Sequence, residues 1–181
     1  MNYLEKESKI LNVNVEELIE KLKSLGAVEV FNDNRVITHF DTKEGTYMGE
    51  SKVIKITEEG KVKLSYSGKT SEGKEDIKLT VSRKEEAVDF LNRIGLFPIS
   101  ESKSHRISFE WEGVDFDIDT FPQIPPFLEI DLGNSSHTLE DISEKLELQK
   151  NEIAEMGTPA IYGKYQLDYF EIFKLSSLFG K

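Results

Sequence analysis

The segment Glu5-Lys6-Glu7-Ser8-Lys9 concentrates carboxylates and ammonium groups at short, regular spacing near the start of the chain. In a β-strand, alternate side chains share a face, so Glu5, Glu7 and Lys9 would lie together at intervals of about 7 Å. In a helix, Glu5 and Lys9 would still form an i,i+4 ion pair, but Glu7 would turn away. The strand interpretation places two repelling carboxylates side by side and therefore predicts a divalent metal and a polyphosphate between them. A solvated edge strand is the alternative, because short motifs often match by chance.

The composition limits the class of protein that must position this segment. The chain has 181 residues, of which 38% are hydrophobic and 31% charged, which indicates one globular domain over residues 1–181 and excludes a disordered chain. The net charge of −11 argues against a nucleic-acid partner, although a local basic cluster could still hold a small anion. The absence of cysteine excludes disulfides, thiol catalysis and zinc-thiolate sites. No apolar run is long enough to cross a membrane and the start of the chain does not resemble a signal peptide, so we expect a cytoplasmic protein without a membrane partner.

Two amphipathic helices are predicted in the first half of the chain. Asn14 and Glu17 are spaced as a capping box, and Gly26 is suited to end the helix that follows. Its apolar stripe consists of Val15, Leu18, Ile19, Leu22 and Leu25. Residues 85–95 resemble residues 16–26, with Ser82 as the predicted cap. The likeness indicates either two similar halves or simply two amphipathic helices.

The C-terminal third has weaker helical signals. Thr138 and Asp141 predict a cap for a third helix that continues to about Leu148, and Thr158-Pro159 predicts the start of a short fourth segment. Aromatic residues near the end are expected in the core, with a barrel mouth or a dimer contact as alternatives. These are Tyr162, Tyr165, Tyr169, Phe170 and Phe173. The sequence leaves the oligomeric state open, a homodimer included.

Between these helices, polar and apolar residues alternate with a period of two. The alternation runs through residues 61–67, 76–81, 106–111, 114–119 and 128–132. Each segment is therefore predicted to be a strand with one apolar face, which helices must cover, and one polar face. Short glycine-bearing turns at 58–60, 71–73 and 112–113 favour antiparallel connections. The polar faces could meet water, or about eight strands could close into an antiparallel β-barrel with a charged lumen.

Two motifs at opposite ends of the chain resemble those of the CYTH superfamily, also called triphosphate tunnel metalloenzymes. Residues 5–9 resemble the ExExK signature, and residues 118–122 with 124–131 resemble the late strand pair of that family. The resemblance extends over about residues 1–170 and implies an α+β fold: a closed eight-stranded antiparallel β-barrel, the tunnel, with helices packed outside. Members cleave or cyclise triphosphates with Mg²⁺ or Mn²⁺ and include inorganic triphosphatases, thiamine triphosphatases and class IV adenylyl cyclases.

The resemblance also implies roles for particular residues. The implied metal ligands are Glu5, Glu7, Glu129 and Asp131, with Asp119 nearby. The implied phosphate contacts are Lys9, Lys55 in the place of the first arginine of an LRIR-like strand, and Arg106 in the late basic motif. This chemistry is coherent, since Mg²⁺ takes oxygen ligands while Lys and Arg neutralise the remaining phosphate charge.

Several positions depart from the family pattern and bear on activity. Thr57 stands where a second arginine is expected, Ser67 where a lysine is usual, and Lys78 where an acidic residue is usual. In the run of residues 103–106 the basic residues are out of their usual spacing. Substitute positive charge could come from Lys63, Lys69 or Lys78.

Three functions therefore stay open. The chain could be a class IV adenylyl cyclase-like enzyme that converts ATP to cyclic AMP and pyrophosphate. The resemblance of residues 125–131 to that branch of the family slightly favours this function. It could be a triphosphatase, or a binding protein for polyphosphate or nucleotide that has lost turnover. Other candidate sites are weaker, because the three histidines share no metal-ligand spacing.

Overall fold

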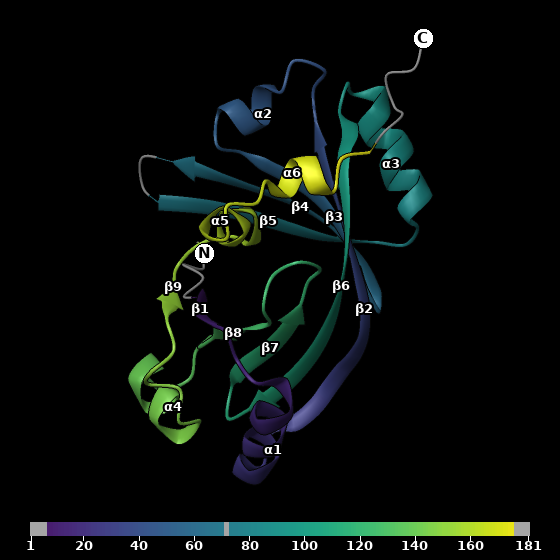
Figure 1. Ribbon diagram of the computed structural model, residues 1–181. Helices are drawn as coiled ribbons and strands as arrows, with labels where there is room; N and C mark the ends of the chain where they lie inside the picture. The colour runs from purple at the N-terminus through teal and green to yellow at the C-terminus, as the bar shows by residue number, and fades with distance from the viewer. Residues whose placement is uncertain (1–6, 71–72, 176–181) are drawn as a thin grey trace. The chain divides into compact units, whose positions relative to one another are not determined.

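The structure is a computed structural model that describes residues 7–70 and 73–175 of the chain (Figure 1). Glu5 lies outside these residues. The strands are β1 (Glu7–Leu11), β2 (Val28–Asp41), β3 (Val53–Glu59), β4 (Lys61–Thr70), β5 (Gly73–Val81), β6 (Phe97–Trp111), β7 (Val114–Thr120), β8 (Phe127–Asp131) and β9 (Ile153–Ala154). The helices are α1 (Val15–Leu25), α2 (Thr46–Gly49), α3 (Lys84–Arg93), α4 (Leu139–Lys145), α5 (Thr158–Lys164) and α6 (Tyr169–Ile172). The predicted α+β class is confirmed. Within the described ranges, no helix combines the length and apolar character needed to cross a membrane.

The strands form one antiparallel sheet in the hydrogen-bonded order β5-β4-β3-β2-β6-β7-β8-β1-β9. The predicted count of eight is wrong, because the two-residue strand β9 pairs with β1 through Lys9↔Ala154 and Ile10↔Ile153. Antiparallel pairing is confirmed, but closure is not: among the residues that the structure describes, the order has two ends, at β5 and β9. The physical reason for the ninth strand is that β9 satisfies backbone groups on the edge of β1 that β8 leaves unpaired.

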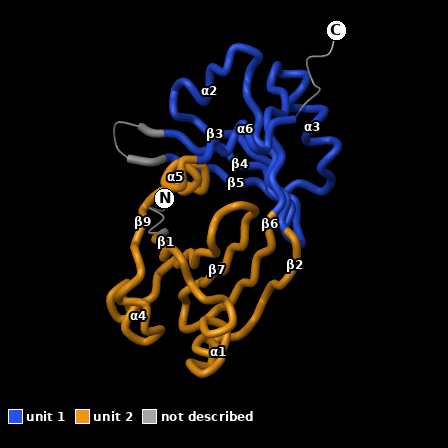
Figure 2. Tube along the Cα trace, viewed as in Figure 1, with its two compact units in different colours: residues 1–2, 35–103, 167–181 blue, residues 3–34, 104–166 orange. Residues whose placement is uncertain are grey.

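The chain divides into two compact units (Figure 2). Unit 1 consists of residues 1–2, 35–103 and 167–181, and unit 2 consists of residues 3–34 and 104–166. Strands β2 and β6 pass through both units. The expected single domain over residues 1–181 stays a prediction.

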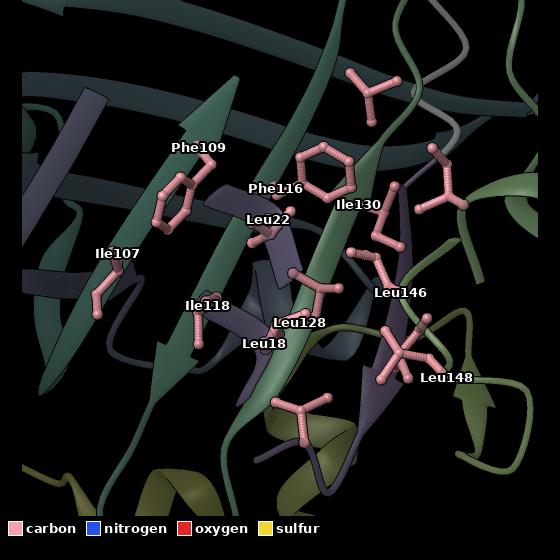
Figure 3. Close-up of a cluster of buried hydrophobic side chains, with 14 residues drawn as sticks. Leu18, Leu22, Ile107, Phe109, Phe116, Ile118, Leu128, Ile130, Leu146 and Leu148 are labelled. Atoms are coloured by element: carbon pink, nitrogen blue, oxygen red, sulfur yellow. The ribbon is translucent and has the colours of Figure 1, made fainter. Parts of the chain in front are cut away.

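In unit 2, helix α1 covers the apolar face of strands β1, β6, β7 and β8. The Asn14 side chain accepts a hydrogen bond from the Glu17 backbone N–H at 3.3 Å, and Gly26 ends the helix with a φ of 87°, as the sequence predicts. Leu18 and Leu22 point from α1 into the cluster (Figure 3). The buried cluster is Ile10, Val13, Leu18, Leu22, Ile107, Phe109, Val114, Phe116, Ile118, Leu128, Ile130, Ile142, Leu146 and Leu148. The apolar half of the alternating pattern is therefore the core of unit 2.

In unit 1, helix α3 covers the apolar face in a similar way. Its Ala87 and Leu91 pack against Phe40, Ile54 and Ile56 of strands β2 and β3. The predicted cap at Ser82 is wrong: the cap residue is Arg83, which has extended backbone and no capping side-chain hydrogen bond. A cap at Ser82 would start the helix at residue 83, but the helix starts at Lys84. A serine hydroxyl therefore does not cap its first turn.

The shorter predicted features agree more closely. Thr138 and Asp141 form both hydrogen bonds of a capping box at the start of α4, which ends at Lys145, short of the expected Leu148. The predicted segment at Thr158-Pro159 is helix α5. Glu112 and Gly113, with φ values of 49° and 79°, form the tight turn between β6 and β7. This turn fixes the register in which the two strands bring their polar residues together.

We expect Phe109→Ala to destabilise the protein by about 3–5 kcal/mol, because it removes a fully buried ring and leaves a cavity. The matched control is Phe90→Ala, whose side chain is 58% exposed and whose change should stay within about 0.5 kcal/mol. Urea unfolding of both variants measures the difference. Equal losses would contradict the placement of the core.

Candidate functional site

The polar face of unit 2 is the face of β1, β6, β7 and β8 opposite its core. Lys9 lies opposite Glu129, Glu129 opposite Asp117, and Asp117 opposite Ser108. Directly opposite residues on antiparallel strands share a face. The charged and polar side chains described on this face include Lys9, Ser104, Arg106, Ser108, Glu110, Asp115, Asp117, Asp119, Glu129 and Asp131. The structure therefore gathers most of the predicted site residues, from both ends of the sequence, on one surface.

Arg106 organises the buried part of this face. Its Nε donates to Asp119 Oδ1 at 2.7 Å and its Nη2 donates to Asp119 Oδ2 at 2.5 Å, a two-pronged ion pair. Its Nη1 donates to Asp117, and its Nη2 lies 3.9 Å from Glu129 Oε2. Asp119 is 0% exposed and Arg106 8% exposed, so each charge depends on the other for its stabilisation.

The rest of the face extends this network. Lys9 Nζ lies 2.9 Å from Glu129 Oε2, and Ser108 donates to Asp117 Oδ1 at 2.5 Å. Asp131 lies one row further along the strands, where its Oδ1 accepts a hydrogen bond from the Gly133 N–H at 2.9 Å. Glu7 is opposite Asp131 in the backbone register, but its side chain lies outside the description. The predicted metal and phosphate residues Glu129, Asp119, Lys9 and Arg106 are thus paired with one another.

The pKa values reflect these neighbours. Burial opposes the charge of Arg106, but Asp119, then Glu129 and Asp117, more than offset it and raise its pKa above the usual range. Burial raises the pKa of Asp117, against the opposing effects of Arg106 and Ser108. Burial, followed by repulsion from Glu110, Asp131 and Asp117, raises the pKa of Asp115. The face carries more negative charge than its two cations compensate.

Of the residues expected at the metal site, Glu129, Asp131 and Asp119 have described side chains on this face. Carboxylate oxygens are the ligand type that Mg²⁺ and Mn²⁺ prefer. Within residues 7–70 and 73–175, however, no three acidic or histidine side chains are arranged to hold a metal. In chemical type the face fits the ion, whereas Asp117 and Asp119 are paired with Arg106, and Glu129 is paired with Lys9.

The polar face of unit 1 carries a different set of residues. Lys55 lies opposite His39 on β2 and opposite Ser65 on β4, and Thr57 lies opposite Lys63. Among the charged side chains on this face are Arg35, Lys55, Glu59, Lys63, Asp76 and Lys78. Lys63 contacts Glu59 at 2.6 Å and Lys78 contacts Asp76 at 3.3 Å. The predicted phosphate contact Lys55 is therefore in unit 1, on a face with more basic than acidic residues.

His39 is the residue of unit 1 whose setting the sequence did not indicate. Its Nδ1 lies 3.2 Å from Ser100 Oγ, and the rings of Tyr169 and Phe170 pack edge-on at 5.6 and 5.4 Å. Burial, reinforced by the charge of Lys55, lowers the pKa of His39 to about 3. His39 is therefore neutral at physiological pH and packs as part of the fold.

Sequence reasoning also missed the roles of Asp117 and Ser108 in the network around Arg106. Their alternation with apolar residues placed them on a polar face, and this signal was available. The sequence did not indicate which side chain each of them contacts, because the pairing depends on the register of β7 against β6 and β8.

The comparisons with known proteins concern the fold. No family model matches the sequence, and no curated protein matches it. A Vibrio parahaemolyticus protein described as a "putative adenylate cyclase" is 17% identical with a TM-score of 0.67, over 99% of this chain and 97% of that one. A Bacillus halodurans protein with the same description is 16% identical with a TM-score of 0.63, over 87% and 96%.

A Hippeastrum protein described as a "putative adenylyl cyclase" with a dominant triphosphatase activity is 15% identical, with a TM-score of 0.67, over 93% of this chain and 99% of that one. These similarities span nearly whole chains. The chain therefore shares its fold with these three proteins.

We expect Arg106→Met to lower the free energy of unfolding by about 3–5 kcal/mol, because it leaves the buried Asp119 carboxylate without its partner. The matched control is Arg93→Met, which breaks the exposed pair with Asp89 and should leave the stability nearly unchanged. Urea unfolding at pH 7 without ligand measures both. A small effect of Arg106→Met would mean that the ion pair does not hold the register.

His39 also predicts a pH dependence. Below pH 6.5 the unfolded chain protonates this histidine and the folded chain does not, so stability falls as the pH is lowered from about 6.5 towards 3. Its contribution to the slope is up to about 1.4 kcal/mol per pH unit. His39→Phe should remove this slope, so the variant gains stability relative to the wild type as the pH falls. If the free energy of unfolding had the same pH dependence in the two proteins between pH 7.5 and 4.5, the buried neutral state of His39 would be contradicted.

Proposed function

We propose that the chain is a divalent-metal-dependent enzyme that acts on a triphosphate. The observation that carries the proposal is the charge on the polar face of unit 2. This face has six carboxylates and two cations among its described side chains. A metal-triphosphate complex carries both signs, and this face offers carboxylates for the metal and cations for the phosphates.

On the acidic side, we assign metal binding to Glu5, Glu7, Glu129 and Asp131, with Asp119 as a neighbour. When bound, Mg²⁺ or Mn²⁺ would supply oxygen coordination and charge compensation for the phosphates. Glu129 is held by Lys9, and Asp119 by Arg106. These contacts fix the orientation of the carboxylates before any ligand arrives.

We assign phosphate binding to Lys9 and Arg106 on the polar face of unit 2, and to Lys55 on the polar face of unit 1. Lys9 and Arg106 already contact carboxylates, so a phosphate must either displace these carboxylates or bind alongside them. Catalysis would then consist mainly of positioning the triphosphate and stabilising charge during displacement at phosphorus. Closure of the strands into a tunnel around that substrate is part of this proposal.

Cyclisation and hydrolysis are the two reactions that such a site could perform. In a cyclase, the ribose 3′-hydroxyl of ATP would attack the α-phosphorus and release pyrophosphate. In a triphosphatase, water would attack the terminal phosphorus and release orthophosphate. The structural relatives include proteins described with each activity, and this supports the shared substrate class more than either reaction.

A binding protein without turnover is the second candidate, and unit 1 favours it. Thr57 is buried and uncharged where the family pattern has an arginine. Ser67 donates to Asp76 at 2.7 Å, and Lys78 contacts the same carboxylate. Two of the three departures are thus engaged with a neighbouring side chain instead of extending the basic surface.

The test is product release from inorganic triphosphate, ATP and thiamine triphosphate, with and without Mg²⁺ or Mn²⁺, with cyclic AMP measured in the ATP sample. We expect metal-dependent release from at least one substrate. Glu129→Gln should lower it by at least about tenfold, because the variant weakens the carboxylate assigned to the metal.

The control is Glu147→Gln, a change at an exposed residue that pairs with Lys21, which should leave turnover unchanged. Equal turnover of Glu129→Gln and wild type would remove the assigned role of Glu129. Triphosphate that raises the melting temperature without any product would support the binding protein. The absence of both triphosphate binding and turnover would contradict the proposal as a whole.

A further inference from the structure

Strand β6 presents serines at alternate positions that lead to Arg106. The residues at these positions are Ser100, Ser102, Ser104, Arg106 and Ser108. Alternate residues of a strand point to the same side, so Ser104 and Arg106 share the polar face of unit 2, about 7 Å apart. The intervening residues turn away: Lys103 is exposed, and His105 Nε2 lies 3.1 Å from Asn32 Oδ1.

Three of the four serines have a clear side-chain partner. Ser100 lies 3.2 Å from His39 Nδ1, Ser102 lies 2.6 Å from the Tyr169 hydroxyl, and Ser108 donates to Asp117. Each of these hydroxyl groups therefore takes part in the packing of its own unit. Their polarity is explained by the fold alone.

Ser104 differs from the other three. It is only 5% exposed, and its buried Oγ has no hydrogen-bond partner among the described residues. A buried hydroxyl without a partner destabilises a fold, and alanine would fill the same position without that penalty. Such groups call for an explanation outside the folded chain's own contacts, for example a ligand or an ordered water.

We propose that the Ser104 hydroxyl donates a hydrogen bond to an anionic oxygen of the triphosphate, beside the group bound by Arg106. This inference rests on the proposed function and adds a phosphate-binding residue to that site. A polyphosphate carries anionic oxygens along its length, so a hydroxyl and a guanidinium on one strand face can bind neighbouring phosphate groups. Unlike Arg106, Ser104 releases no carboxylate when it binds.

The test compares Ser104→Ala with wild type by calorimetric titration with inorganic tripolyphosphate in the presence of Mg²⁺, together with thermal melting without ligand. We expect about tenfold weaker binding, the loss of one hydrogen bond to a charged acceptor. We expect a melting temperature equal to or above that of the wild type, since no contact within the protein is lost. Ser104→Thr, which keeps a hydroxyl, should restore the affinity.

The matched control is Ser102→Ala, which removes the contact with Tyr169 and should lower the melting temperature while leaving the affinity unchanged. Equal affinity of Ser104→Ala and wild type would overturn the inference and leave the proposed function standing. A lower melting temperature of Ser104→Ala would also overturn it, because the hydroxyl would then support the fold. Absence of tripolyphosphate binding by the wild type would instead contradict the proposed function itself.

Discussion

The ion pair between Arg106 and Asp119 is the interaction on which the arrangement of unit 2 depends. Both residues are nearly or fully buried, and a buried charge is tolerated only with a well-placed partner. The pair requires Arg106 opposite Asp119, and this register also sets Ser108 opposite Asp117. A slip of one residue would turn Ile107 and Phe109 out of the core, so packing and ion pairing select the same register. The polar face is therefore fixed by the same contacts that stabilise the unit.

This arrangement has an electrostatic consequence for any ligand. Lys9 and Arg106 are engaged with Glu129, Asp117 and Asp119, so an anion that binds them must compete with those carboxylates. The competition is reduced if the carboxylates gain another cation at the same time. An acidic face of this kind therefore favours a metal-anion complex over a free anion. Burial, and then repulsion from Glu110, Asp131 and Asp117, raises the pKa of Asp115, and this repulsion reflects the same excess of negative charge.

The sequence predicted the parts of the fold that follow from local patterns. Strand alternation identified both faces of β4 to β8. Asn14 and Thr138 correctly indicated the starts of α1 and α4, and Gly113 correctly indicated the turn between β6 and β7. The errors concern features without a repeating pattern. Strand β9 has two residues and exists because of the edge that it covers, and the start of α3 was displaced by one residue. The burial of His39 depends on α6, more than a hundred residues further along the chain, which no local pattern around His39 indicates.

The candidate site shows a sharper limit of sequence reasoning, because residue type alone does not decide whether a charge serves the fold or a ligand. Arg106 was assigned to phosphate from its motif, yet it also holds Asp119 in the interior. Ser104 carried no signal beyond its place in a strand, yet its hydroxyl is the one in that row of serines whose presence the described contacts do not explain. Relatives of the same fold at 15–17% identity are described with cyclase and triphosphatase activities, so the fold does not select the reaction. The selection must therefore come from contacts made by individual polar groups such as these.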